Sequence, residues 1–261
     1  ATPILSETDI ERSVEEGEFG TLPTHNGAYA QKAAGHTVHL NPESETFDIY
    51  TGANTWGAPE LSVPLRRSGE SDFAYESVVY AFLPDEGLLL EHPDGTVEYY
   101  DLSVRRPLKS LPARAGDGGV LRLCDYDGAS HTVFLTDYSS VYTWNMDSGK
   151  TDSLMVIRPY SIGNGAEMLT GVMCVDEHHL LALVGQGNHR VIDRRTGEVM
   201  FMLEYGYWLD GVGREPNLSH ADSYLSEIKY IAPLDQLYTL SSGGVLRVYD
   251  MASGKMLQCV P

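Results

Sequence analysis

The chain has 261 residues, and its 42% hydrophobic content is enough for a sizeable core in one large domain or two small ones. Its formal net charge of −19 gives it a field that repels nucleic-acid backbones and anionic membrane surfaces, so we expect neither generic nucleic-acid binding nor membrane binding. Three cysteines are too few for a disulfide framework; the apolar settings of Cys124 and Cys174 predict reduced thiols and an intracellular protein, cytoplasmic or nuclear.

The first 20 residues form an acidic lead-in. Ser6 with Asp9 is a capping signal, and it predicts a short helix over 6–17, with a solvated acidic segment as the alternative. No stretch reaches 18 apolar residues, and no signal-peptide pattern opens the chain. Strand-like but irregular runs follow at 37–40, 46–50 and 61–65, and they predict an irregular first sheet. The pattern leaves open whether 20–33 supplies the missing strand of that sheet or belongs to a further one.

Four more regular units follow, each built from short apolar runs separated by hairpin-type turns. Such a pattern predicts a four-stranded antiparallel meander in each unit. The predicted strands are 78–83, 88–91, 96–100 and 108–111 in the second unit; 120–124, 132–136, 141–144 and 153–157 in the third; 169–175, 180–184, 189–192 and 199–203 in the fourth; and 227–232, 236–240, 245–249 and 255–260 in the fifth.

The units are copies of one repeat. Asp101, Asn145, Asp193 and Asp250 each end a third strand, and by subtraction they lie 44, 48 and 57 residues apart. This spacing is close to the roughly 40–45 residues of a propeller blade with longer loops. One such sheet cannot bury both faces alone, so the repeat predicts an all-β propeller over 21–261, a single domain with five visible blades and room for a sixth before residue 70.

Four short motifs resemble the WD-repeat propeller family over about 75–260, and more weakly before that. They are Ser219-His220 in place of Gly-His, Pro233-Leu234-Asp235 at the first hairpin, Tyr249-Asp250 in place of Trp-Asp, and the third-strand segment from Asp94 to Asp101. Gly243 stands where the family usually has a turn Asp. The resemblance implies a scaffold or adaptor that binds a partner through its loops.

In that family, the loops that join the fourth strand of one blade to the first strand of the next line one mouth of the channel. Every such junction here carries an Arg, which could grip carboxylate or phosphate oxygens or could pair with nearby acids. The connection at 204–222 is long and rich in aromatic residues. The predicted partner-binding residues are Arg66, Arg67, Arg114, Arg158, Tyr160, Tyr205, Tyr207, Trp208 and Arg214.

No catalytic motif and no cofactor signature is recognisable, and we expect neither His178 with His179 nor His36 with His39 to bind a metal. The sequence therefore predicts a non-catalytic module for an acidic or phosphorylated protein or peptide, as a subunit of a larger assembly. Two alternatives stay open. One is a propeller glycoside hydrolase or related carbohydrate-active protein, which would need two converging carboxylates. The other is a purely structural piece of a longer chain.

Overall fold

The computed structural model describes the repeated part of the chain, while the expected helix at 6–17 lies outside the described residues. These are 20–21, 24–25, 32–33, 36–41, 44–51, 57–65, 79–83, 87–112, 121–156, 161–162, 165–166, 169–184, 189–203, 225–241 and 243–260. The chain divides into two compact units. Unit 1 comprises 1–22, 138–143 and 151–261, and unit 2 comprises 23–137 and 144–150.

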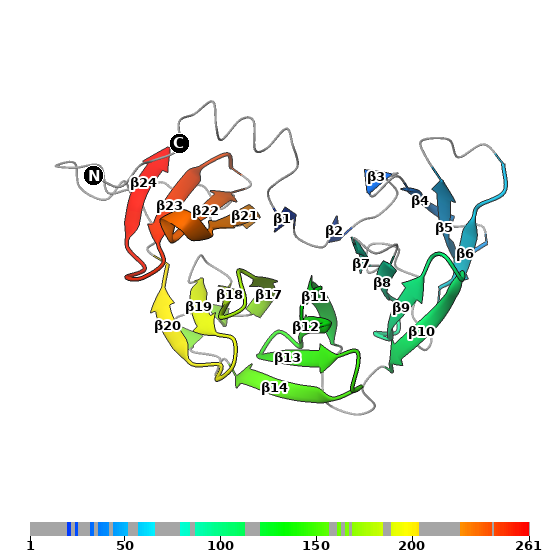
Figure 1. Cartoon of the computed structure of the whole chain (residues 1–261), viewed down its shortest axis with the longest axis horizontal. Coiled ribbons are helices and arrows are strands. Elements are labelled where there is room, and N and C mark those ends of the chain that lie inside the picture. The colour runs from blue at the N-terminus through cyan, green and yellow to red at the C-terminus, as the bar shows by residue number, and fades with distance from the viewer. Residues whose placement is uncertain are drawn as a thin grey trace. The chain divides into compact units, whose positions relative to one another are not determined.

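The described residues form antiparallel sheets of the β-propeller fold class, which confirms the predicted fold (Figure 1). The order of the first sheet is β3 (Lys32–Ala33), β4 (His36–Asn41), β5 (Thr46–Thr51), β6 (Leu61–Pro64). The second is β2 (Thr24–His25), β7 (Val79–Leu83), β8 (Gly87–Glu91), β9 (Val97–Asp101), β10 (Arg106–Leu111). The third is β11 (Arg122–Asp127), β12 (Thr132–Thr136), β13 (Ser140–Asn145), β14 (Thr151–Val156).

The remaining sheets lie later in the chain. The fourth sheet is β17 (Leu169–Cys174), β18 (His179–Val184), β19 (Arg190–Asp193), β20 (Val199–Met202). The fifth is β1 (Gly20–Thr21), β21 (Leu225–Ile231), β22 (Gln236–Ser241), β23 (Leu246–Asp250), β24 (Met256–Val260), with a 3-10 turn η4 (Ala232–Leu234) between β21 and β22. A separate hairpin joins β15 (Ser161–Ile162) to β16 (Gly165–Ala166).

The described residues at 20–21, 24–25 and 32–33 do not form a sheet of their own. Instead, this segment adds a two-residue strand to each of three sheets: β1 pairs with β21, β2 with β7, and β3 with β4. Each of these partners is the first strand of its meander. The question that the sequence left open is therefore answered by a shared segment. In the first sheet, β6 is the third strand of the meander, and the residues that follow Leu65 lie outside the described part.

The third-to-fourth turn is the repeated element that the marker residues predicted. Asp101, Asn145, Asp193 and Asp250 each accept turn hydrogen bonds on a side-chain oxygen. The backbone N–H four residues later donates to the carbonyl of each marker residue. The residue that donates this hydrogen bond has a left-handed backbone conformation in each turn: Arg105 (φ 55°), Gly149 (φ 72°), Gly197 (φ 74°) and Gly254 (φ 70°). Glycine adopts this conformation without steric cost, which explains the Ser/Thr-Gly signature.

Apolar side chains from neighbouring sheets form shared cores within each unit. In unit 2, Phe47 and Ile49 of the first sheet pack with Leu88 and Leu90 of the second. In unit 1, the fourth and fifth sheets share a second cluster, to which Leu181 and Leu237 contribute completely buried side chains. Burial of one such side chain contributes about 1.5–3 kcal/mol. The expectation that each sheet buries its faces against its neighbours therefore holds inside each unit.

Candidate partner-binding surface

The predicted binding residues lie outside the described residues. They fall in the connections at 66–78, 113–120, 157–160 and 204–224. Nothing in the described structure brings them together or separates them, so the arginine and aromatic surface stays a prediction. The second-to-third turns lie at the sheet ends from which these connections leave, because strand direction alternates in an antiparallel meander.

A buried carboxylate joins two sheets of unit 2 at this end. Glu91, the last residue of β8, is fully buried. One of its oxygens accepts a hydrogen bond from the backbone N–H of Leu123 at 2.6 Å, and the other accepts from Nη1 of Arg122 at 2.7 Å. Burial raises the pKa of Glu91 to about 7 and outweighs these two donors. Its observed contacts join the second sheet to the third.

A second buried polar group lies on the opposite face of the same sheet. Glu98 accepts hydrogen bonds from Nε2 of His92 at 2.8 Å and from the hydroxyl of Tyr100 at 2.5 Å. Because Glu98 pairs with Leu90, and Leu90 and Glu91 are consecutive, the side chains of Glu91 and Glu98 point to opposite faces. These two carboxylates therefore do not form the converging pair that a glycosidase needs.

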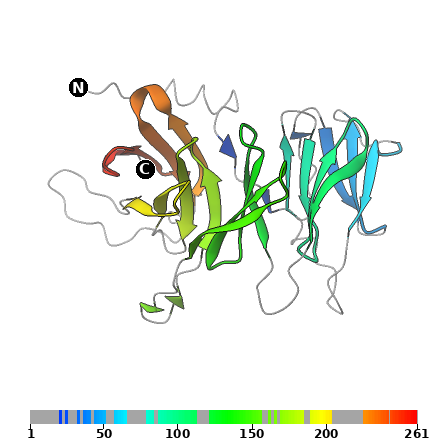
Figure 2. The same cartoon turned by 60° about the horizontal axis from the view of Figure 1, so that its bottom comes forward.

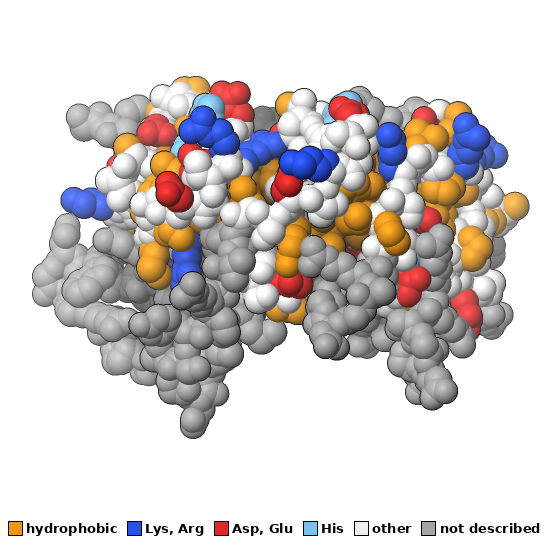
Figure 3. Space-filling model, turned by 90° about the horizontal axis from the view of Figure 1, so that it is seen from below, with side chains coloured by type: hydrophobic (Ala, Val, Ile, Leu, Met, Phe, Trp, Pro, Cys, Tyr) orange, Lys and Arg blue, Asp and Glu red, His pale blue; other side chains and the backbone are white. Residues whose placement is uncertain are grey.

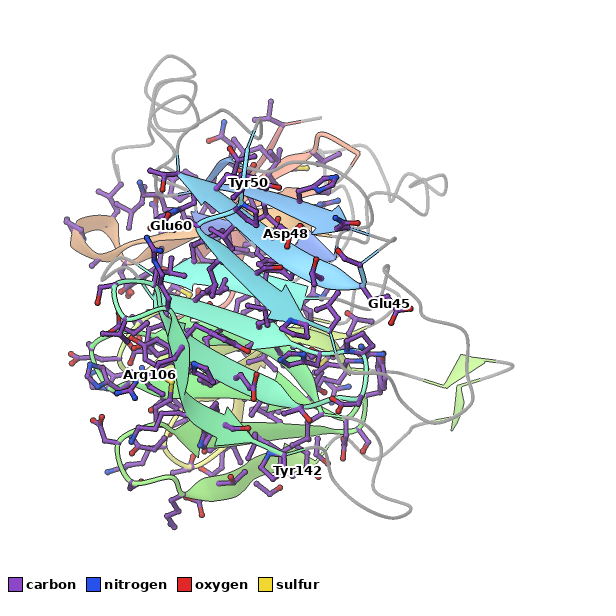
Figure 4. All side chains as sticks on the ribbon, turned by 90° about the vertical axis from the view of Figure 1, so that its right-hand side faces the viewer. Glu45, Asp48, Tyr50, Glu60, Arg106 and Tyr142 are labelled. Atoms are coloured by element: carbon purple, nitrogen blue, oxygen red, sulfur yellow. The ribbon has the colours of Figure 1, made fainter. Side chains whose placement is uncertain are left out.

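The first sheet carries a further acidic group, shown in Figure 4. Asp48 accepts a hydrogen bond from the hydroxyl of Ser62 at 2.5 Å. Glu60 accepts from the hydroxyl of Thr51 and lies 3.5 Å from a guanidinium nitrogen of Arg105, which is 59% exposed. Both carboxylates have hydrogen-bond partners in the first sheet, and Glu60 also faces Arg105 of the second. These contacts are typical of carboxylates with a structural role.

Each of the four third-to-fourth turns carries an exposed basic residue. These are Arg105, Lys150, Arg195 and Lys255. The chain has 37 acidic and only 18 basic residues, so a basic residue at every one of these turns departs from its overall charge. The junctions that the sequence predicts to bind a partner leave from the other sheet end. In two of the four turns, the Ser-Gly-Lys motif is a sequence signal for this basic residue.

Three of the fourth strands also carry an exposed apolar residue at the same place. In β10, β20 and β24 the register with the third strand shifts by one residue, which leaves an unpaired bulge residue: Leu108, Met200 or Leu257. Each lies seven residues after its marker residue, and the three side chains are 44%, 50% and 46% exposed. A bulge redirects the side chain of its extra residue, here toward solvent.

In unit 1, two of these strands carry exposed apolar residues in neighbouring sheets. β20 and β24 are the outer strands of the fourth and fifth sheets (Figures 1 and 2). A Cβ atom added to Gly254, in the turn before β24, would lie only 2.4 Å from the ring of Phe201 in β20. We call the exposed side chains of these strands the β20–β24 patch; they are Val199, Met200, Met202, Leu257 and Val260. Figure 3 shows hydrophobic side chains exposed beside Lys and Arg side chains on the face viewed there.

The other fourth strands differ from the patch in sequence. β20 reads Val-Met-Phe-Met and β24 reads Met-Leu-Gln-Cys-Val, so neither contains a charged residue. β10 contains Arg106, Pro107 and Lys109, and β14 has the exposed Asp152 at the position of the apolar bulge residue. Charges, proline and bulges are the usual protection of a sheet edge against strand pairing. β20 and β24 have bulges but neither charges nor proline, and methionine suits an adaptable contact surface.

The described residues contain neither a metal-binding cluster nor a membrane-spanning helix. No group of three or more His, Cys, Asp or Glu side chains among them is arranged to hold a metal ion. None of the described helical turns is long and apolar enough to cross a membrane. Cys124, Cys174 and Cys259 form no disulfide bond with one another.

Comparisons with known proteins show the fold and no family. No family model matches the chain, and no curated protein matches its sequence. Among solved structures, it is similar to the computationally designed protein Ika8, with a TM-score of 0.55 and 14% identity over 89% of this chain and 61% of that one. It is also similar to the propeller protein BamB from Moraxella catarrhalis, with a TM-score of 0.51 and 14% identity over 91% of this chain and 64% of that one. The chain thus spans less than two thirds of either protein, and at this identity the likeness shows the β-propeller fold alone.

Proposed function

We propose that this chain is a non-catalytic propeller scaffold that holds a protein partner, as an intracellular subunit of a larger assembly. The observation that carries the proposal is the β20–β24 patch. Its bulge residues expose about half of their surface, and the two strands contain neither a charged residue nor proline. Exposed apolar surface that a solvated edge does not need is typical of a docking site. The buried acids described above, with their protein partners, support a structural role.

A comparison of variants tests this function. Met200→Glu with Leu257→Glu should abolish co-purification of a partner and leave the melting temperature nearly unchanged, because both side chains are already half exposed. Val104→Glu is the matched control, since Val104 is 50% exposed in a turn outside the patch. Quantitative mass spectrometry of the three purifications gives the readout. Equal recovery of every co-purified protein from all three would contradict the proposal.

The connections around Trp208 and Arg158 remain a second proposed contact surface on the same scaffold. If Trp208 is a contact hot spot, Trp208→Ala should weaken partner binding by about 2 kcal/mol or more and leave thermal stability nearly unchanged. Arg158→Glu should weaken it further and reduce its salt dependence. Loss of stability with retained binding would instead assign Trp208 to packing. Membership of the WD-repeat family is likewise part of the proposal, and it is supported by the sequence motifs alone.

A further inference from the structure

We infer that the β20–β24 patch takes an acidic amphipathic helix of the partner protein. This inference rests on the proposed function and specifies the chemistry of the partner at the same surface. The apolar requirement comes from Met200 and Leu257, which the bulges direct outward, and from the uncharged strands around them.

The bulges disfavour the simplest alternative, an added strand. A partner strand must keep a continuous ladder of backbone hydrogen bonds along the edge to which it pairs. In β20 the unpaired Met200 lies between Val199 and Phe201, and in β24 Leu257 lies between Met256 and Gln258. Each extra residue interrupts the ladder with the third strand and bends the edge strand, which disfavours pairing at its free edge. A partner that packs on side chains, as the apolar face of a helix does, fits this surface better.

The acidic requirement comes from the turns that precede the two strands. Arg195 precedes β20, Lys255 precedes β24, and both side chains are exposed. The carboxylates of Asp193 and Asp250 keep their charge, but hydrogen bonds within the same turns hold them in place, and Asp193 also attracts Arg195. Among the described residues of these two turns, Glu198 is the exposed acid. A helix with acidic residues beside its apolar stripe would place them against Arg195 and Lys255. Such complementarity between charged rims selects partners and accelerates association.

Blade three supplies a built-in control. Its turn carries the exposed Lys150, but Asp152 occupies the position of the apolar bulge residue. Lys150 is therefore a basic turn residue without the apolar bulge residue, and it serves as a control for charge. If the apolar residue and the basic residue act together, Lys150 should contribute nothing.

The experiment uses fluorescein-labelled peptides of about 18 residues, long enough for five helical turns. The first has a leucine stripe at helical spacing with glutamates beside it; the second has lysines in place of the glutamates; the third has the leucines and glutamates in strict alternation, as in a strand. Fluorescence anisotropy with the full chain should show binding of the first peptide alone. Circular dichroism should show that the first peptide gains helix on binding.

Variants of the full chain then assign the contact. Met200→Glu with Leu257→Glu, and separately Arg195→Glu with Lys255→Glu, should each weaken binding of the acidic helix about tenfold or more. Lys150→Glu should leave it unchanged. If the glutamate variants disturb folding, Met200→Gln with Leu257→Gln should still weaken binding without adding charge.

The outcomes separate this inference from the proposed function. Binding of the lysine or the alternating peptide as tightly as the acidic helix would overturn the inference. So would no binding of any peptide by a chain whose co-purified partner is still lost on Met200→Glu with Leu257→Glu, although the proposed function would then stand. Binding that is equal in wild type and in the patch variants would contradict the location of the site and, with unchanged co-purification, the proposed function as well.

Discussion

At the scale of single residues, the fold depends on a few buried polar groups whose environments are unusual. Glu91 shows this most clearly. Burial raises the pKa of its carboxyl group by more than the two hydrogen bonds and the positive charge of Arg122 lower it. Since its pKa in the folded chain is raised from 4.5 to about 7, folding favours the protonated form. The stability that this group contributes is complete below pH 4.5 and is lost as the pH rises through 7.

Glu91→Gln removes this titration and tests it. The stability of wild type relative to the variant should fall by about 2 kcal/mol between pH 5.5 and pH 8, with the sign set by the raised pKa. Urea unfolding of both proteins at the two pH values measures the difference. A gap that stays constant, or that widens in favour of wild type at pH 8, would mean that Glu91 is ionised in the folded chain and that Arg122 outweighs burial.

At the scale of elements, the repeated turn has a conformational role at every copy and a packing role at some copies. Two glycines show the difference. Gly149 and Gly197 occupy the same turn position with φ near +70°. A Cβ atom on Gly149 would meet nothing within 4 Å, whereas one on Gly197 would lie 1.9 Å from the carbonyl oxygen of Leu154 in β14. The turn at Gly197 thus packs directly against the preceding sheet of unit 1.

The alanine variants should therefore differ. Gly149→Ala should lose about 1 kcal/mol of unfolding free energy, the cost of a left-handed alanine. Gly197→Ala should lose about 3 kcal/mol or more, because the turn or β14 must also shift. Chemical denaturation of both variants provides the comparison. Equal losses would show that only backbone conformation constrains this position.

The elements also show where sequence reasoning worked and where it could not. Alternating apolar residues and Ser/Thr-Gly turns predicted the meanders, because both signals are local to a strand or a hairpin. The two-residue strands β1, β2 and β3 carry no such signal, since their pairing depends on distant first strands. The bulges were missed because alternation places each residue of a strand on one of two faces, whereas a bulge inserts one residue outside that alternation. Met200 and Leu257 were therefore read as ordinary strand residues.

At the scale of the whole molecule, the shared cores make the sheets interdependent. The fifth sheet covers Leu181 and Met173 of the fourth through the common cluster of unit 1. Deleting 224–261 should uncover these side chains and leave an aggregating protein, while the full chain from 21 to 260 should unfold in one cooperative transition. Size-exclusion chromatography and calorimetry of both proteins give the answer. A soluble truncated chain with a cooperative transition would contradict this interdependence.

The placement of partner binding on the β20–β24 patch is the central claim, and site-specific photo-crosslinking tests it most directly. A photoreactive phenylalanine analogue is placed in the full chain at position 200, 257, 208 or 104, and crosslinking is carried out in cells. The account predicts that positions 200 and 257 capture the same partner, through its acidic amphipathic segment, and that position 104 captures none. Capture from position 208 alone, with none from 200 or 257, would contradict it and place the partner on the connection at 204–224.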